Sequence, residues 1–176
     1  MALIFITGVA GSGKSAVRKE LVARGFEAYD TDNDGMTAWV NKETGEEVNQ
    51  PKEEWGSRTA EWYSHHEWVV SLLRVKDLIE RSRTSNIFLC GTGSNRAEII
   101  KLADMTLSLS VDEETLKDRI ATRKNSFGKQ AHELKNILEW RADVTELVEA
   151  AGAVIVDTNR PLTEVVDEIL KRVEFF

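Results

Sequence analysis

A short glycine-rich stretch constrains this chain more than any other part of its sequence. Residues 8–15 read Gly-Val-Ala-Gly-Ser-Gly-Lys-Ser, follow the apolar run Leu3–Ile6 and precede a segment of helical character that continues to Arg24. Between a strand and a helix, such glycines let the backbone curl so that its N–H groups surround a phosphate. Lys14 can then reach the β- and γ-phosphates, and the Ser15 hydroxyl can ligate Mg²⁺. The stretch predicts a nucleoside triphosphate site made by Gly8, Gly11, Ser12, Gly13, Lys14, Ser15 and Ala16.

The alternative is a glycine-rich turn that only joins a strand to a helix. The complete motif, the order of the flanking segments and the position near the start of the chain all favour the phosphate site instead.

Short apolar runs recur along the rest of the chain and alternate with segments of helical periodicity. The runs are Phe26–Tyr29, Ile87–Cys90, Met105–Val111 and Ala153–Val156. This alternation is typical of an α/β fold in which a parallel sheet is covered by helices on both faces. A chain of 176 residues has room for one such unit, so we expect a single domain over residues 1–176.

Two segments interrupt the simple alternation. Residues 31–83 would form an insert, in which Thr44-Gly45 predicts a turn between extended pieces around Val40 and Val48, followed by a long helix from about Lys52 to Arg83. Residues 124–130 form a basic, glycine-containing loop between two helical segments. Such a loop suits a mobile lid, and an ordinary helix–helix connection is the alternative.

Acidic side chains follow the second expected strand. Asp30 and Asp32 would project to the same side of an extended backbone. Ligands of open α/β sheets bind beyond the carboxyl ends of the strands, where the phosphate loop also lies. Transfer of a phosphoryl group needs one acidic group near the metal and one that orients and deprotonates the attacking hydroxyl, which these two aspartates can supply. For Asp34, capping of a turn is the simpler interpretation.

Composition narrows the range of partners and compartments. The net charge of −7 disfavours nucleic acid or an acidic membrane as the main partner. Cys90 is the only cysteine, which excludes an internal disulfide and fits a reducing compartment. No apolar run has membrane-spanning length, and the start of the chain lacks the pattern of a secretory signal. We therefore expect a soluble, cytoplasmic protein.

Three motifs together resemble the shikimate kinases. They are the phosphate loop, Tyr29-Asp30-Thr31-Asp32 after the second strand, and the stretch Phe88–Gly93 after the third. Gluconate kinases and, more distantly, nucleoside monophosphate kinases share this plan. The loop Asn125–Lys129 and the Trp- and His-rich segments also resemble a broad group of small bacterial P-loop ATPases related to these kinases. The resemblance implies a three-layer P-loop NTPase fold, with a five-stranded parallel sheet of order 2-3-1-4-5, an inserted acceptor-binding region and a short lid.

The resemblance also implies roles for individual residues. It places Mg²⁺ on Ser15 and Asp30, the acceptor hydroxyl on Asp32, and the transferring phosphate on Lys14 and Arg123. Further expected nucleotide contacts are Arg119, Thr158 and Asn159, and the expected acceptor contacts are Asp32, Arg58, Gly91, Thr92 and Gly93. The implied activity is transfer of a phosphoryl group from ATP, with Mg²⁺, to a hydroxyl or phosphate of a small molecule.

The acceptor region departs from the small polar pockets that hold shikimate, because it is rich in tryptophan: Trp39, Trp55, Trp62 and Trp68. These rings could stack on a nucleoside-like acceptor, or they could form the core of the insert. Similarly, His65 and His66 could assist proton transfer and Arg96 and Arg141 could clamp phosphate, or all four could be packing and surface groups.

Two other classes use parts of the same pattern. An ATP-binding switch without an acceptor would use the same loop and Mg²⁺, but it would have little use for both a lid and an insert. A regulatory GTPase needs an Asn-Lys-x-Asp motif, which Asn41-Lys42-Glu43-Thr44 does not match. The sequence leaves open whether the protein is a monomer or a homodimer.

Overall fold

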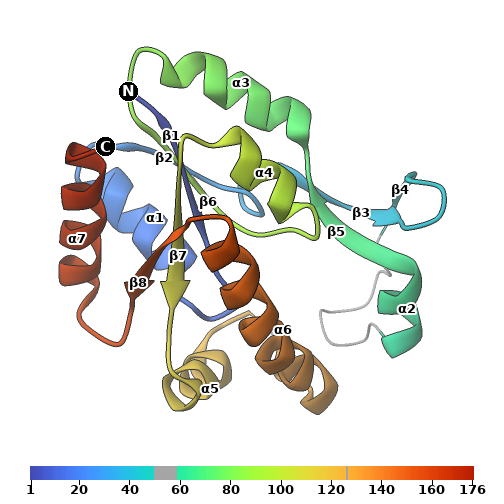
Figure 1. Ribbon diagram of the computed structural model, residues 1–176. Coiled ribbons are helices and arrows are strands. Elements are labelled where there is room, and N and C mark those ends of the chain that lie inside the picture. The colour runs from blue at the N-terminus through green and yellow to red at the C-terminus, as the bar shows by residue number, and fades with distance from the viewer. Residues whose placement is uncertain (50–58, 126) are drawn as a thin grey trace.

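A parallel sheet of five strands forms the centre of the computed structural model, which describes residues 1–49, 59–125 and 127–176. Its spatial order is β2-β6-β1-β7-β8, which is the predicted order 2-3-1-4-5 when only these strands are counted (Figure 1). The strands are β1 (Leu3–Thr7), β2 (Glu27–Asp30), β6 (Ile87–Cys90), β7 (Met105–Ser110) and β8 (Val154–Asp157). All four neighbouring pairs run parallel, so their carboxyl ends lie at one edge of the sheet.

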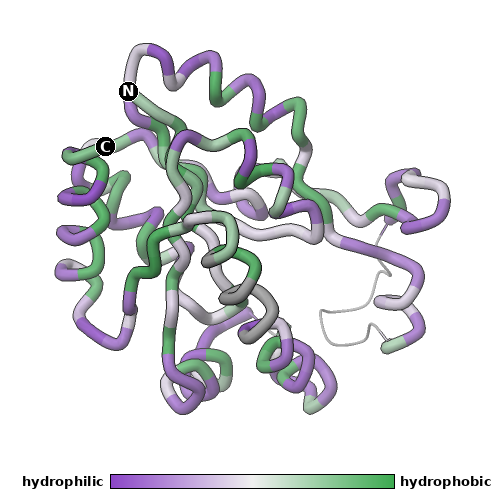
Figure 2. The backbone as a smooth tube through the Cα atoms, in the orientation of Figure 1, coloured by the Kyte–Doolittle hydropathy of each residue, from purple (hydrophilic) through white to green (hydrophobic). Residues whose placement is uncertain are grey.

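Helices cover both faces of this sheet, which makes the three layers that the sequence predicts. On one face lie α1 (Lys14–Ala23) and α7 (Leu162–Glu174), and on the other lie α3 (Leu72–Ser82) and α4 (Arg96–Leu102). In Figure 2, α7 is hydrophobic on the side that faces the sheet and hydrophilic on its outer side. The helices α5 (Glu113–Thr122) and α6 (Ala131–Ala150) pack with Val9 and Val111 in a third cluster, beside the phosphate loop.

The central strand β1 shows why both faces need a cover. Successive side chains of a strand point to opposite faces. Ile4 and Ile6 belong to the cluster with α1 and α7, whereas Leu3 and Phe5 belong to the cluster with α3. All four side chains have 0% exposure, and burial of each contributes roughly 1.5–3 kcal/mol. This buried strand runs directly into the phosphate loop and gives that loop a rigid base.

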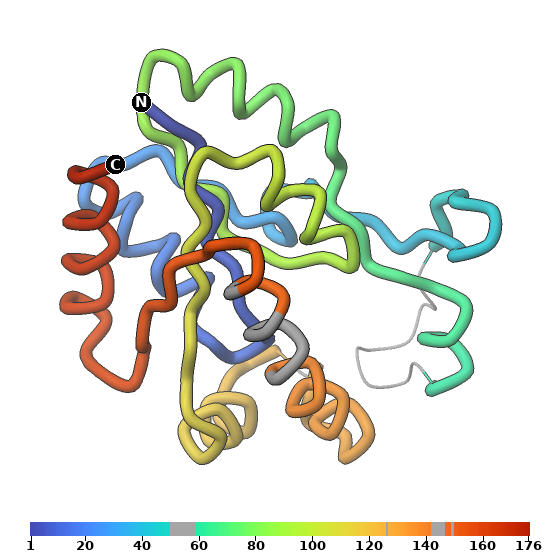
Figure 3. Tube along the Cα trace, in the orientation of Figure 1, coloured from blue at the N-terminus to red at the C-terminus, as the bar shows by residue number. Residues whose placement is uncertain are grey.

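The insert carries a second, antiparallel sheet of order β4-β3-β5 and projects from the main sheet (Figures 1 and 3). Its strands are β3 (Thr37–Asn41), β4 (Glu47–Val48) and β5 (His66–Val70). The predicted turn at Thr44-Gly45 is confirmed, because Trp39 pairs with Val48 on either side of it. Gly45 has a φ of 70° and donates its N–H to the Asn41 carbonyl at 2.8 Å.

The predicted continuous helix from Lys52 to Arg83 is wrong. Residues 50–58 lie outside the described part of the chain, and the rest forms α2 (Ala60–His65), then β5, then α3. The strand β5 has the sequence His-Glu-Trp-Val-Val, which is rich in aromatic and β-branched residues that favour strands. It pairs with β3 along its whole length, and Ser71 then caps α3 by accepting the N–H of Arg74. Tertiary pairing therefore outweighs the helical periodicity.

Candidate nucleotide and acceptor site

The phosphate loop lies at the carboxyl end of β1 and opens α1, as its motif requires. Gly8, Gly11 and Gly13 have φ values of 142°, 89° and 107°, a region that other residues rarely adopt. A Cβ atom at Gly8 would also lie 2.8 Å from the Leu109 carbonyl oxygen. Glycine is thus required by both conformation and space, and the loop leaves the N-terminus of α1 open toward a ligand.

Lys14 is held inside the curve of this loop. Its Nζ donates to the carbonyl oxygens of Gly8 at 2.7 Å and Val9 at 2.8 Å. Burial lowers the pKa of Lys14 from 10.5 to about 8, an effect that the Asp32 and Asp30 carboxylates partly oppose and that the Arg123 charge reinforces. The Lys14 amine therefore lies within electrostatic range of both aspartates and of Arg123.

A hydroxyl and a carboxylate meet beside the loop where Mg²⁺ is expected. The Ser15 hydroxyl donates to Asp30 Oδ2 at 2.8 Å, and Asp30 is buried at 5% exposure. Mg²⁺ prefers hard oxygen ligands and usually takes one or two from the protein, completing its shell with phosphates and water. In the described residues, His, Cys, Asp and Glu form no cluster of three or more that could hold a metal. The two oxygen donors of the Ser15–Asp30 pair fit a Mg²⁺ ion that takes its other ligands from nucleotide phosphates and water.

Asp32 and Asp34 occupy different surroundings in the turn after β2. Asp34 accepts the N–H of Asp30 at 2.7 Å and pairs with Arg18 at 3.5 Å, so it stabilises the turn, as the simpler interpretation has it. Asp32 instead points its Oδ1 toward the Nε1 of Trp68 at 3.0 Å and the Oγ1 of Thr37 at 3.3 Å. Asp34 is therefore a structural residue of the turn, and Asp32 remains the functional candidate.

The glycine-rich loop after β6 lies against this turn. A Cβ atom at Gly91 would come within 2.7 Å of the buried Thr31 Cβ and closer still to its Oγ1 and Cγ2. A Cβ at Gly93 would lie 3.2 Å from the Trp68 carbonyl oxygen. Thr92, between them, is half-buried. Because Gly91 and Gly93 lack a Cβ atom, their loop can pack closely against both the acidic turn and the insert sheet.

This packing gives a stability prediction. Gly91→Ala should destabilise the protein by about 1–3 kcal/mol, because the added methyl group overpacks a buried site. The melting temperature should fall by several degrees in thermal denaturation. The neighbouring half-buried variant Thr92→Ala is the control, with a smaller expected change. An unchanged melting temperature for Gly91→Ala would show that Thr31 can move away freely.

The residues expected beside the nucleotide base are joined to the phosphate loop. Arg119 donates to the Thr158 Oγ1 at 3.0 Å and to the Thr158 carbonyl at 2.6 Å. The Thr158 hydroxyl lies 3.1 Å from the Ser12 carbonyl oxygen. Asn159 accepts the N–H of Asp112, at the start of α5, through its Oδ1 at 3.2 Å. These contacts bring Arg119, Thr158 and Asn159 to one side of the loop.

The predicted lid packs onto α6 in this structure. Arg123 donates through Nη2 to the Phe127 carbonyl, and burial lowers its pKa, opposed by Glu133. Its Nε is buried and has no hydrogen-bond partner in the part of the chain that is described. The Gly128 N–H donates to Glu133 Oε2 at 2.8 Å. Lys129 is exposed, and residue 126 lies outside the described residues.

Sequence reasoning missed Glu133, which is fully buried at 0% exposure in the first turn of α6. Besides Gly128, it faces the Tyr63 hydroxyl of α2 at 3.5 Å. The enrichment of acidic residues in first turns could have drawn attention to it. The contacts show that it joins the lid to the insert.

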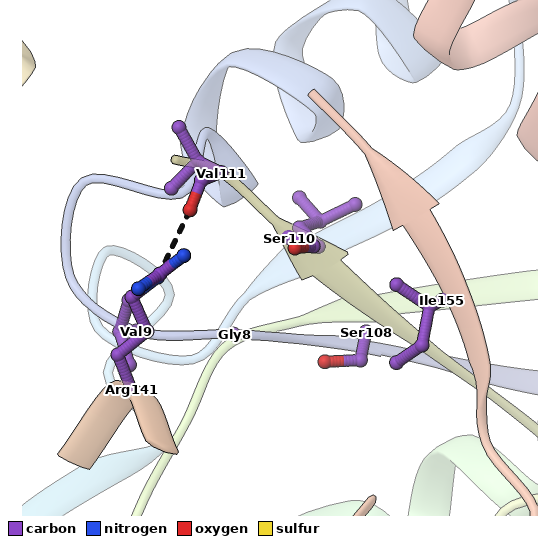
Figure 4. A pocket seen from close by; sticks show the side chains of 8 residues that line it. Gly8, Val9, Ser108, Ser110, Val111, Arg141 and Ile155 are labelled. Carbon is purple, nitrogen blue, oxygen red and sulfur yellow. Dashed lines mark hydrogen bonds between the residues drawn. The ribbon is translucent and has the colours of Figure 1, made fainter. Parts of the chain in front are cut away.

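Three groups of candidate residues make packing or backbone contacts within the protein. Three rings pack on Trp39 at centroid distances of 5.2–6.3 Å, namely those of Trp62, Tyr63 and Trp68. Trp39 is 7% exposed, which agrees with core packing of the insert. His66 stacks on Trp62 at 3.7 Å. Arg141 donates to the Val111 carbonyl at 3.0 Å and lines a small cavity with Gly8 and Val9 (Figure 4).

The remaining candidates are Arg96, Arg58 and Trp55. Arg96 donates to the Gly93 carbonyl oxygen at 3.2 Å and thus supports the glycine loop. Arg58 and Trp55 lie outside the described residues.

Comparison with known families identifies the family to which this chain belongs. The family AAA_18, described as an AAA domain, matches residues 4–149, a span that includes the phosphate loop, the insert and most of α6. The chain belongs to this AAA domain family. No curated protein sequence matches this AAA-family chain.

Solved structures with the same fold include several kinases. A shikimate kinase from Aquifex aeolicus is 23% identical, with a TM-score of 0.57 over 98% of this chain and 96% of its own. A shikimate kinase from Acinetobacter baumannii in complex with shikimate is 15% identical, with a TM-score of 0.62 over 98% and 93%. The deoxyadenosine kinase from M. mycoides is 16% identical, with a TM-score of 0.58 over 99% and 100%. At these identities, the likeness establishes the P-loop kinase fold of this AAA-family chain.

Within the described residues, no helix of this AAA-family chain combines the length and hydropathy needed to span a membrane.

Proposed function

We propose that the protein transfers the γ-phosphoryl group of ATP, with Mg²⁺, to a hydroxyl of a small molecule. The observation that carries the proposal is the position of Asp32. Its N–H donates to Asp30 Oδ1 at 3.1 Å, so the candidate base lies directly beside the candidate metal pair. The charges of both aspartates act on Lys14. A switch that only hydrolyses ATP could use this carboxylate to orient water, but it would have little use for both a lid and an insert beside it.

The proposed roles follow the contacts of each side chain. Lys14 would leave the carbonyl oxygens of Gly8 and Val9 and donate to the β- and γ-phosphates. Ser15 and Asp30 would hold Mg²⁺, which when bound neutralises charge on the phosphates. Asp32 would accept the proton of the acceptor hydroxyl while the new O–P bond forms and the bond to the β-phosphate oxygen breaks, releasing ADP.

Arg123 would supply the remaining positive charge. Its buried Nε is unsatisfied among the described residues, and its charge already acts on Lys14. A phosphoryl group that develops charge during transfer would give this nitrogen a partner. Arg119, Thr158 and Asn159 would contact the base on the other side of the loop. The lid at 124–130 would close over the nucleotide and exclude water.

The lowered pKa of Lys14 predicts a proton linkage. A bound phosphate favours the charged amine and raises its pKa above about 8. Below this pH, Lys14 is already protonated, so Mg-ATP binds without proton uptake. At about pH 9, binding should take up close to one proton, and the affinity should fall as pH rises. Calorimetry in buffers of different ionisation enthalpy measures this uptake.

Lys14→Arg is the matched control for the linkage, because a guanidinium stays charged over this whole range. Equal proton uptake in the wild type and Lys14→Arg would assign the titration to another group.

The class of acceptor is tested by measuring ADP formation with a panel of polyols, sugar acids, nucleosides and nucleoside monophosphates. We expect one class to raise ATP turnover many-fold. Nucleosides belong in the panel because the deoxyadenosine kinase shares this fold, although the mutual packing of the tryptophans favours a non-aromatic acceptor. Turnover that no acceptor raises would favour the ATP-hydrolysing switch.

A further inference from the structure

The insert sheet presents one face to the acidic turn after β2. Thr37 and Trp39 are two residues apart on β3, so their side chains lie on the same face of the sheet. Trp68 lies directly across from Trp39 on β5, so its side chain shares this face. From it, the Trp68 Nε1 donates to Asp32 Oδ1 at 3.0 Å, and the Thr37 Oγ1 lies 3.3 Å from the same oxygen. The insert therefore contacts the candidate base directly.

Among the described residues, the donors that approach the Asp32 side chain all lie beside one oxygen, Oδ1. The Thr31 Oγ1 is a third donor near Oδ1, at 3.4 Å. In the portion of the chain that is described, no donor contacts Oδ2. An indole N–H donates only and cannot accept. It therefore holds Oδ1 as an acceptor and leaves Oδ2 as the oxygen that can take a proton.

The backbone of Trp68 holds the other side of the same site. Its carbonyl oxygen accepts the N–H of Ser94 at 2.8 Å, directly after the Gly91–Gly93 loop. Two residues along β5, Val70 exchanges two hydrogen bonds with the Asn95 side chain, at 3.0 and 2.9 Å. One strand thus fixes both the acidic turn and the glycine loop.

The ring of Trp68 is itself fixed by its neighbours. It packs on Trp39 at a centroid distance of 5.2 Å, and Trp39 packs in turn on Trp62 and Tyr63. A side chain locked by packing loses little freedom when it forms a hydrogen bond, so it positions its partner well. The aromatic cluster therefore acts as a support behind the indole N–H.

We propose that Trp68 is a positioning residue for Asp32. Resting on the proposed function, this inference holds that the indole N–H fixes Oδ1 and thereby directs Oδ2 to the acceptor hydroxyl. It explains why an insert rich in tryptophan lies beside the acceptor without the rings being needed to stack on it. Specificity and rate would then depend on the insert sheet as a whole.

A double-mutant cycle tests the proposal. Trp68→Phe removes the N–H and keeps an aromatic ring, and it should lower kcat about tenfold while the Kd for Mg-ATP and the KM for the acceptor change little. In an Asp32→Ala background, Trp68→Phe should have no further effect on kcat, because the group that it positions is gone. Trp140→Phe is the control, since Trp140 is 41% exposed on α6.

The cycle can use acceptor-independent ATP hydrolysis, in which water takes the place of the acceptor hydroxyl. A second readout needs no turnover: the indole N–H resonance of Trp68, identified by its loss in Trp68→Phe, should shift when Asp32 is replaced by alanine. Equal losses of kcat from Trp68→Phe in both backgrounds, or an unmoved resonance, would overturn the inference and leave the proposed function standing. Unaltered turnover in Asp32→Ala would instead overturn the proposed function, and the inference with it.

Discussion

Replacing Lys14 by alanine should reduce phosphoryl transfer by at least about 10²- to 10³-fold, the loss typical of a missing group that stabilises transition-state charge. Among the described residues, the Lys14 Nζ donates to the Gly8 and Val9 carbonyl oxygens, which are parts of the loop itself. The main sheet and its clusters do not depend on it. Steady-state ADP formation with Mg-ATP measures the loss, and circular dichroism checks the fold.

Lys19→Ala is the matched control, because Lys19 lies exposed on the same helix, α1. It should keep wild-type turnover. Near-native turnover in Lys14→Ala would mean that the loop does not bind the transferring phosphate.

Replacing Asp32 by asparagine should lower kcat by about 10²- to 10⁴-fold, the usual contribution of a general base. The amide keeps the size of the side chain and can still accept the Trp68 N–H. It cannot accept the acceptor proton at the position of Oδ2. The Kd for Mg-ATP should change little, because Ser15 and Asp30 form the metal pair. Rapid-quench kinetics and equilibrium nucleotide binding measure the two effects separately.

Asp77→Asn makes the same chemical change on the exposed side of α3 and should leave kcat and the Kd for Mg-ATP unchanged. A parallel loss of Mg-ATP affinity in Asp32→Asn would place Asp32 in the metal shell. Unchanged kcat and Kd would remove Asp32 from the site altogether.

The fold of the main sheet is predictable because its signals are local. The run Leu3–Ile6, the phosphate loop and the later apolar runs each encode a strand or turn by themselves, and the parallel sheet follows from their alternation. The segment His66–Val70 is different. Its local pattern is compatible with a helix, and only pairing with β3, about thirty residues earlier in the chain, makes it a strand.

The candidate site also contains residues that the sequence predicts and contacts that it does not. Lys14, Ser15, Asp30 and Asp32 follow from a motif and from the rule that ligands bind at the carboxyl ends of strands. The contacts of Trp68 with Asp32 and of Glu133 with Gly128 depend instead on how the insert and α6 pack. No spacing in the sequence encodes these contacts, since each partner is placed by a different element.

The most direct test of the central claim is to follow the γ-phosphate itself. The protein is incubated with Mg²⁺ and ATP that carries an isotope label in the γ-phosphate, together with the acceptor that raises turnover most, and the products are analysed by mass spectrometry. We expect labelled phosphate esterified to an acceptor hydroxyl in step with ADP formation, and loss of this product in Asp32→Asn. Label found only in inorganic phosphate, with the acceptor unmodified, would contradict it.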